Sequence, residues 1–481
     1  MLGLLHLLLL PHSGTDYAAQ EARASFARDY PLTPVDLSWY AGIHPFGYSI
    51  FSPYVMAVVG VGLTGLISAV AAALLLARLL RNTPHPTAGA YSGAVFCVAD
   101  VVSGRTTFAI GAVFALAALV VLPRRVPAVA LAVLTAFASP VAAAFLGLAA
   151  ASLVLRRKPG GWPIGVASAL PVGILGWLFP TGGIQPYEYA SAPYAVIAGL
   201  LLALLTHSWS IRFGALMYAL ASSLLLLSPD PFGSNILRLG LLLAAPLVLA
   251  TATEHWKVVV PLAVLLSYWQ LQPPYADLRA KHAPSFTAVT RQLVALDAKR
   301  VEVVPLRDHG EASRIAPIVP LARGWSRQVD TGRNLFPFYR GALSTEEYRQ
   351  WLIDNAVDYV ALAPNAKADR GGRGERALLL VGSVRGLERV WSDDDWVVWR
   401  FIDAKPIASK PVEVLRTGRT TISLRSPQRA YVDLVVRWSR WLSVDGPACL
   451  EKHGSWTRIR FTGAGEATVS SKLAFRPQGH C

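Results

Sequence analysis

Residues 52–80 read SPYVMAVVGVGLTGLISAVAAALLLARLL, and Arg78 carries the only charge in this run. A helix that crosses a membrane needs about 20 mostly apolar residues, so this run predicts a membrane-spanning segment. Several of the other apolar runs are shorter and predict either full crossings or half-helices. Those runs lie near residues 88–103, 106–122, 126–138, 140–155, 163–179, 192–206, 213–228, 235–253 and 257–272.

Charge is distributed unevenly along the 481 residues, whose mean hydropathy is +0.41. Residues 1–275 contain 13 Lys/Arg and 8 Asp/Glu, which leaves 32 and 22 of the chain's 45 and 30 for the last 206 residues. This split predicts an α-helical membrane half followed by a water-soluble half.

Basic residues in the first half fall on alternate connections, and cytoplasmic connections are the ones enriched in Lys and Arg. The rule places residues 12–50, 103–106, 180–191, 228–235 and everything after about residue 273 outside a plasma membrane. We expect about eleven crossings. That number counts residues 1–11 as a truncated first helix, because they lack the charged start and cleavage site of a signal peptide. The basic residues are Arg78, Arg81, Arg124, Arg125, Arg156, Arg157, Lys158, Arg212 and Lys257.

The soluble half is predicted to begin after a stiff linker, Gln272-Pro273-Pro274. We therefore predict a membrane domain at 1–274, an α/β module at 275–403 and a β-sandwich at 404–481. The assignment depends on helical patterns at 286–297 and 345–355 and on short β-branched runs between Gly, Pro and Ser turns. Cys449 and Cys481 can pair if this half lies outside the cytosol, or stay free.

Several classes of function lack their sequence signatures. The chain has no Gly-Lys-Ser/Thr phosphate loop, no Gly-x-Gly-x-x-Gly after a strand, no Cys-x-x-Cys and no His-Glu-x-x-His. The net charge of +15 is spread over membrane ends and the soluble half, which does not indicate nucleic acid. We expect no metal site, although the sequence neither identifies a cofactor nor excludes a divalent metal.

The polar stretch Gly14-Thr15-Asp16-Tyr17-Ala18-Ala19-Gln20 follows the first apolar segment. Asp16 has two interpretations. It is a helix cap, a position where Asp is preferred, or a general base for an acceptor hydroxyl near the membrane surface. Gln20 lies one helical turn further on and is a candidate substrate contact.

Residues 39–49 are rich in aromatic residues, glycine and proline. Four aromatic residues, Trp39, Tyr40, Phe46 and Tyr48, are either part of an interfacial aromatic belt or stacking faces for a sugar, with His44 as a polar contact.

Two arginines lie beside predicted outer loops, Arg105 in a tight turn and Arg238 just inside an apolar helix after Asn235. A charge at membrane depth usually faces a site or a partner, and a guanidinium suits a phosphate. Both arginines are candidate phosphate ligands. Alternatively, Arg105 reaches to the interface or pairs with Asp100, and Arg238 pairs with Asp230 or Asp100.

Further candidates are loop or soluble residues. Glu188 and Asn235 are predicted substrate contacts in outer loops. In the soluble half, residues 307–311 and 323–330 are dense in hydrogen-bonding groups, which serve in packing and docking or, through Trp325, in carbohydrate contact.

An acidic residue in the first outer loop, many short spans, outer-surface arginines and a C-terminal extracytoplasmic domain resemble the GT-C class of membrane glycosyltransferases. The Gly14–Gln20 stretch is similar to the acidic first-loop signature of that class, although Tyr17 stands where a second acid is common. The Ala- and Arg-rich composition is similar to that of actinobacterial chains, whose GT-C members build cell-envelope glycans.

The resemblance implies a polyprenyl-phosphate-linked sugar donor and a glycan or glycolipid acceptor, with Asp16 as base and Arg105 or Arg238 near the lipid phosphate. One alternative is a non-enzymatic transporter or envelope-assembly subunit, in which Asp100 and Arg105 matter more than Asp16. Another is a lipid-binding accessory subunit that has lost the chemistry, which the Tyr17 departure favours.

Overall fold

A computed structural model describes residues 1, 4, 14–187, 189–279, 284–474 and 478–481. The chain divides into two compact units. The first contains Met1–Gln20 and Phe46–Ala280, and the second contains Glu21–Pro45 and Lys281–Cys481. The truncated helix predicted at residues 1–11 falls almost wholly outside the described residues.

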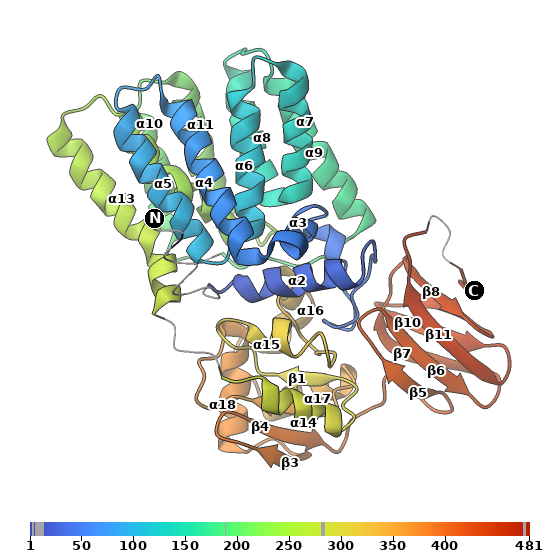
Figure 1. The fold of residues 1–481 in the computed structure, drawn as a ribbon. Helices are drawn as coiled ribbons and strands as arrows, with labels where there is room; N and C mark the ends of the chain where they lie inside the picture. The colour runs from blue at the N-terminus through green and yellow to red at the C-terminus, as the bar shows by residue number, and fades with distance from the viewer. Residues whose placement is uncertain (2–3, 5–13, 188, 280–283, 475–477) are drawn as a thin grey trace. The chain divides into compact units, whose positions relative to one another are not determined.

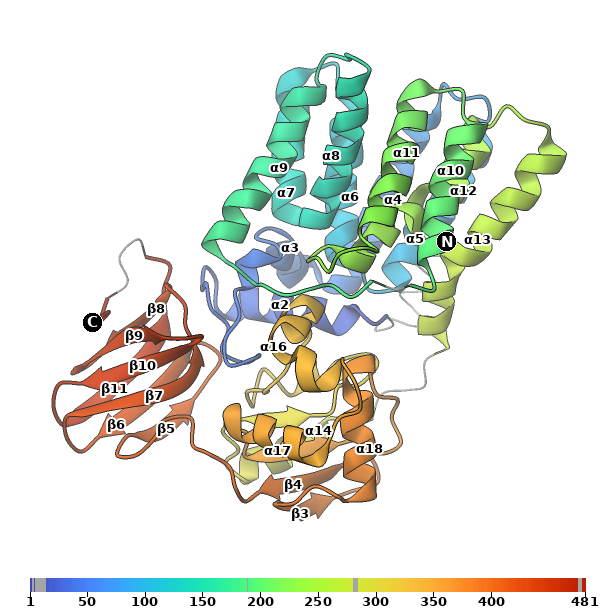
Figure 2. The same ribbon diagram turned by 180° about the vertical axis from the view of Figure 1, so that it is seen from behind.

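The first unit is mostly helical (Figures 1 and 2). Three of its described helical stretches are long and apolar enough to cross a membrane: Val61–Leu80, Gly161–Leu178 and Gly233–Thr251. The helices are α3 Ser52–Val59, α4 Val61–Leu80, α5 Pro86–Val102, α6 Thr106–Val120, α7 Arg125–Ala138, α8 Pro140–Leu155, α9 Gly161–Leu178, α10 Ala192–Leu205, α11 Trp209–Leu224, α12 Leu237–Thr251 and α13 Trp256–Leu278.

Local sequence explains where these helices begin and break. Ser139 caps α8 by accepting a hydrogen bond from the Ala142 amide, and Pro140 occupies the first turn, where it displaces no helical hydrogen bond. The apolar run at 52–80, predicted as one segment, is two helices. Gly60 separates α3 from α4 with a φ of 88°, which glycine adopts without steric cost.

The predicted linker Gln272-Pro273-Pro274 is wrong, because both prolines lie inside α13. The first unit therefore extends to Ala280 rather than ending at residue 274.

The second unit is rich in sheet. Its first part has a four-stranded sheet in the order β1-β2-β4-β3, in which β1 and β2 are parallel and the other pairs are antiparallel. The strands are β1 Val301–Val303, β2 Tyr359–Leu362, β3 Leu387–Ser392 and β4 Val397–Phe401, and the helices are α14 Thr287–Ala295, α15 Gly310–Arg314, α16 Arg327–Phe338, α17 Thr345–Asp354 and α18 Arg373–Val381.

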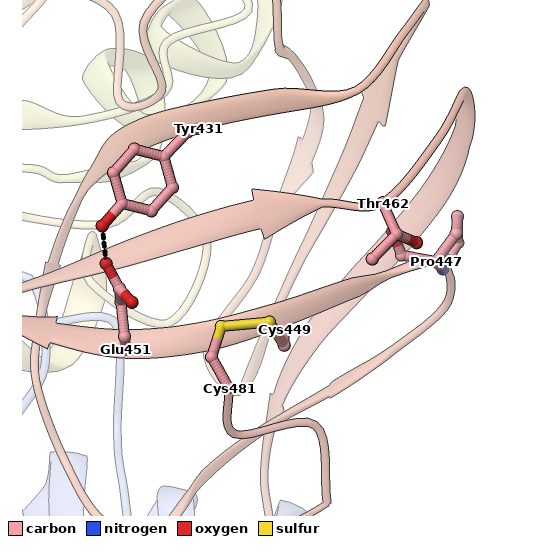
Figure 3. Close-up of a disulfide and its surroundings, with 6 residues drawn as sticks. All are labelled: Tyr431, Pro447, Cys449, Glu451, Thr462 and Cys481. Atoms are coloured by element: carbon pink, nitrogen blue, oxygen red, sulfur yellow. Dashed lines mark hydrogen bonds between the residues drawn. A yellow bond between two sulfur atoms is a disulfide. The ribbon is translucent and has the colours of Figure 1, made fainter.

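The C-terminal part has two antiparallel sheets, ordered β7-β10-β9 and β5-β6-β11-β8. Alternate residues of β7 are buried, as in a sheet that packs on one face. Cys449 and Cys481 form a disulfide (Figure 3), which resolves the two options that the sequence left open. The strands are β5 Glu413–Thr417, β6 Thr421–Ser426, β7 Ala430–Arg437, β8 Leu442–Asp445, β9 Ala448–His453, β10 Trp456–Phe461 and β11 Gly465–Ser471.

Residues 21–45 belong to the second unit, although more than 230 residues of the chain separate them from the rest of that unit, Lys281–Cys481. The Leu321 amide donates to the Ser38 carbonyl at 2.9 Å, and the Tyr40 hydroxyl donates to the Gly324 carbonyl at 2.6 Å. Trp39 and Tyr40 are 2% and 3% exposed in the hydrophobic core of this unit. Neither an aromatic belt nor a sugar platform therefore describes these two residues.

Candidate functional site

The polar groups of the first unit gather where two glycine-containing loops touch. Helix α2 (Tyr17–Asp29) follows the loop of Gly14, and α6 follows the loop of Gly104. These glycines have φ angles of 109° and 76°, and a Cβ at Gly104 would lie 2.4 Å from the Tyr17 nitrogen. Only glycine permits both this backbone conformation and this close approach. The contact brings Asp16 and Arg105 to the same end of the unit.

Asp16 forms an ion pair with Arg238 at the start of α12. Arg238 Nη2 donates to Asp16 Oδ2 at 2.9 Å, and the two side chains are 14% and 22% exposed. The pair joins residues 222 positions apart. Because the partner of Arg238 is Asp16, the predicted pairing with Asp230 is wrong. Asp230 instead accepts hydrogen bonds from the amides of Phe232 and Gly233 in its own loop.

A second ion pair lies within electrostatic reach of the first. Arg105 Nη1 donates to Asp100 Oδ1 at 3.5 Å, which confirms the predicted pairing of these two residues. Asp100 also interacts electrostatically with Arg238 and Asp16. Asp16, Arg238, Asp100 and Arg105 therefore make one cluster, which we call the four-charge cluster.

Three further candidates lie near this cluster. Gln20 is buried, and its Oε1 accepts a hydrogen bond from the Thr107 hydroxyl at 2.5 Å, which ties α2 to the first turn of α6. Tyr48 interacts electrostatically with Arg238. Asn235 is buried in the turn that leads into α12, three residues before Arg238. Sequence reasoning missed Thr107, which no motif distinguishes from other helix-start threonines.

The remaining predicted residues are not shown at this cluster. His44 belongs to the second unit, where its Nε2 lies 2.9 Å from the Ser439 hydroxyl. Glu188 lies outside the described residues. No group of three or more His, Cys, Asp or Glu among the described residues is arranged to hold a metal ion.

An apolar cavity of about 460 Å³ lies among six helices of the first unit. It is lined from α4, α6, α8, α10, α11 and α12, and Phe108 and Leu239 are among its lining residues. Phe108 also lies beside the four-charge cluster, since its ring centroid is 5.8 Å from the Arg238 guanidinium.

The second unit contains a different polar cluster, centred on Arg323. This guanidinium contacts Glu302 at 2.6 Å and also pairs with Glu375, and the three side chains are at most 2% exposed. Burial raises the pKa of Glu302 well above its ordinary value and raises that of Glu375. The carboxyls satisfy one arginine inside a core, which indicates a structural role.

Beside it, the His309 ring stacks on Trp325 with centroids 3.5 Å apart. Its Nδ1 lies 3.2 Å from Glu311, and its Nε2 lies 3.8 Å from Asp369. Although burial opposes the charge, these carboxylates raise the pKa of His309 from 6.5 to about 9. The Arg327 guanidinium also lies 4.8 Å from the Trp325 ring centroid. Both His309 and Arg327 therefore contact Trp325, the ring predicted as a possible carbohydrate contact.

Compared with known protein families, curated proteins and solved structures, the chain has no match. Any function proposed for the protein therefore depends on the geometry and chemistry of its own residues.

Proposed function

We propose that the protein is a multi-pass plasma-membrane glycosyltransferase that transfers a sugar from a polyprenyl-phosphate donor to an extracytoplasmic glycan or glycolipid. The observation that carries the proposal is the Asp16–Arg238 ion pair of 2.9 Å beside the Asp100–Arg105 pair. These pairs bring two carboxylates and two guanidinium groups together at the ends of apolar helices. Sugar transfer from a lipid phosphate needs a base for the acceptor and positive charge for the leaving phosphate.

In the proposed reaction, the donor phosphate binds Arg238 and replaces Asp16 as its counter-ion, which releases the carboxylate. The acceptor oxygen then forms a bond to the anomeric carbon of the sugar, with inversion. The bond from that carbon to the phosphate oxygen breaks, and its electron pair leaves with the lipid phosphate. The hydroxyl proton passes to Asp16.

An exposed apolar stripe on α9, one of the three long helices, also supports membrane insertion. On α9, Trp162, Val166, Leu170, Ile174 and Trp177 are all exposed, with tryptophans toward both ends. Such a stripe suits lipid, with aromatic rings at the two interfaces. Helices α6, α7 and α8 have only 14–16 residues, which is short for a hydrocarbon core of about 30 Å.

Contacts between loops support the proposed topology, because loops predicted on the same side of the membrane touch one another. Loops predicted to lie outside touch at Asp16 and Ser103 and at Gln185 and Asp230. On the predicted inner side, the loop after α4 touches the last turn of α12, where the His85 amide donates to the Ala250 carbonyl. Residues 21–45 pack within the second unit, which supports the placement of the first loop and the C-terminal half on the same side of the membrane. The Cys449–Cys481 disulfide suits an extracytoplasmic compartment.

The test is transfer by the full chain reconstituted in vesicles that contain labelled polyprenyl-phosphate sugars and a glycan acceptor. We expect label in the acceptor, and we expect Asp16→Asn to reduce transfer more than Asp100→Asn, because only Asp16 is assigned the proton.

No label in the acceptor with the wild-type chain, or a larger loss with Asp100→Asn than with Asp16→Asn, would favour a transporter or assembly subunit. A buried Asp100–Arg105 pair is what that alternative would use.

A further inference from the structure

We infer that the 460 Å³ cavity of the first unit holds one long apolar chain of a membrane lipid whose anionic head group lies at Arg238 and Arg105. Placing the head group rests on the proposed function. The chain site itself does not, because it depends only on the walls of the cavity.

The walls exclude a water-filled pocket. No lining residue carries a charge, and only Thr83, Ser152, Ser210 and Tyr218 carry a hydroxyl. The Thr83 hydroxyl already donates to the Leu80 carbonyl, and the Ser152 hydroxyl already donates to the Ser210 carbonyl. A buried water needs two to four polar partners, and apolar cavities bind apolar ligands instead.

The cavity is long in the direction of the helices. Its lining residues on α6 run from Phe108 to Leu119 and those on α8 from Ala142 to Leu153. Each span covers about 16 Å at the rise of an α-helix. A linear hydrocarbon or isoprenoid chain suits this shape better than a compact ligand does.

One end of the cavity adjoins the two arginines of the four-charge cluster. Phe108 and Leu239 line this end, next to Arg238, and Arg105 lies one helical turn before Phe108. The opposite end lies near Leu119 and Leu153. An extended chain in the cavity therefore brings an anionic head group to the four-charge cluster.

Small residues such as Gly214 and Ala149 line the cavity, so substitution by a larger residue tests its role directly. A Cβ at Gly214 on α11 would have its nearest neighbours 3.9 Å away, so Gly214→Leu adds a side chain to a wall of the cavity without a clash at Cβ. Gly173 on α9 does not line the cavity and has no atoms within 4 Å of a built Cβ, so Gly173→Leu is the matched control. Ala149→Leu on α8 is a second filling variant if Gly214→Leu does not fold.

The experiment measures binding of geranylgeranyl monophosphate and of uncharged geranylgeraniol to the full chain in phosphatidylcholine nanodiscs. We expect Gly214→Leu to weaken both by about tenfold or more, because it displaces several buried methylenes. Gly173→Leu should leave both unchanged. Arg238→Gln should weaken the monophosphate alone. Unchanged binding of both probes to a folded Gly214→Leu or Ala149→Leu protein overturns the chain site.

Two further results separate the sources of the chain. Release of a co-purified phospholipid when the monophosphate binds shows that both lipids use this cavity. If the monophosphate binds while the phospholipid is retained, the monophosphate does not use the cavity. If Gly214→Leu weakens the monophosphate and Arg238→Gln does not, the chain site stands. The head-group placement and the proposed role of Arg238 in transfer then fail.

Discussion

The four-charge cluster of the first unit and the Arg323 cluster of the second unit both contain ion pairs with little exposure to solvent. They differ in how many carboxyls surround the arginine and in how much of each side chain stays exposed. Arg323 lies at most 4.0 Å from three carboxyls, Glu302, Glu375 and Asp330, and donates to the Gly371 carbonyl as well. Asp16 and Arg238 have one direct ionic contact with each other and keep 22% and 14% of their side chains exposed. An arginine enclosed by buried carboxyls has a structural role, whereas a partly exposed pair can exchange partners with a ligand.

The largest stability effect is expected for Arg323→Met. Removal of the guanidinium leaves buried carboxyls without a counter-ion, which costs about 3–5 kcal/mol. Hydrogen exchange at strand β1 and helix α18 in the full chain measures the loss.

Arg425→Met is the control, because the Arg425–Glu466 pair on the surface is 54% and 61% exposed. Exposed pairs contribute at most about 1 kcal/mol. Equal effects of the two variants would remove the distinction between the clusters.

A smaller effect is expected for His309, and it depends on pH. Its pKa is raised from 6.5 to about 9 in the folded protein by Asp369 and Glu311. The charged histidine therefore contributes stability that is complete below pH 6.5 and is lost as pH rises through about 9. The shift corresponds to about 3 kcal/mol.

Thermal unfolding of the second unit between pH 6 and pH 9.5 checks this expectation. His309→Gln should flatten the pH profile, while His453→Gln should not, because His453 is 51% exposed. A wild-type profile without a decline above pH 6.5 would contradict the assignment.

The smallest stability effect is expected for Gly104→Ala, although its effect on the site is large. An alanine at a φ of 76° costs about 1–3 kcal/mol, and its Cβ would displace the Tyr17 backbone. We expect weaker sugar transfer and a melting temperature that falls by several degrees.

Gly176→Ala on α9 is the matched control, since nothing lies within 4 Å of a Cβ built there. Wild-type transfer by Gly104→Ala would show that the contact between the two loops does not position Asp16.

Long apolar runs made the helices of the first unit predictable. Helix α8 has the predicted bounds because Ser139-Pro140 starts it and Arg156 follows it. The prolines in α13 misled the prediction, since Pro273 and Pro274 read as a linker although the helix continues through them.

Long-range pairing was beyond sequence reasoning. Trp39 was predicted as a surface ring and is a core residue, because its neighbours in the second unit lie about 280 residues further on. Residue type and predicted topology singled out Asp16 and Arg238. Their ion pair depends on two loops meeting, which no local spacing encodes.

The most direct test of the proposed site is the rate of sugar transfer by Asp16→Asn in single-turnover assays at saturating donor. We predict a loss of about 10²–10⁴, the usual contribution of a general base, with donor still bound to Arg238. Asp29→Asn, at the far end of α2 and 44% exposed, should transfer at the wild-type rate. Wild-type transfer by Asp16→Asn would contradict the account.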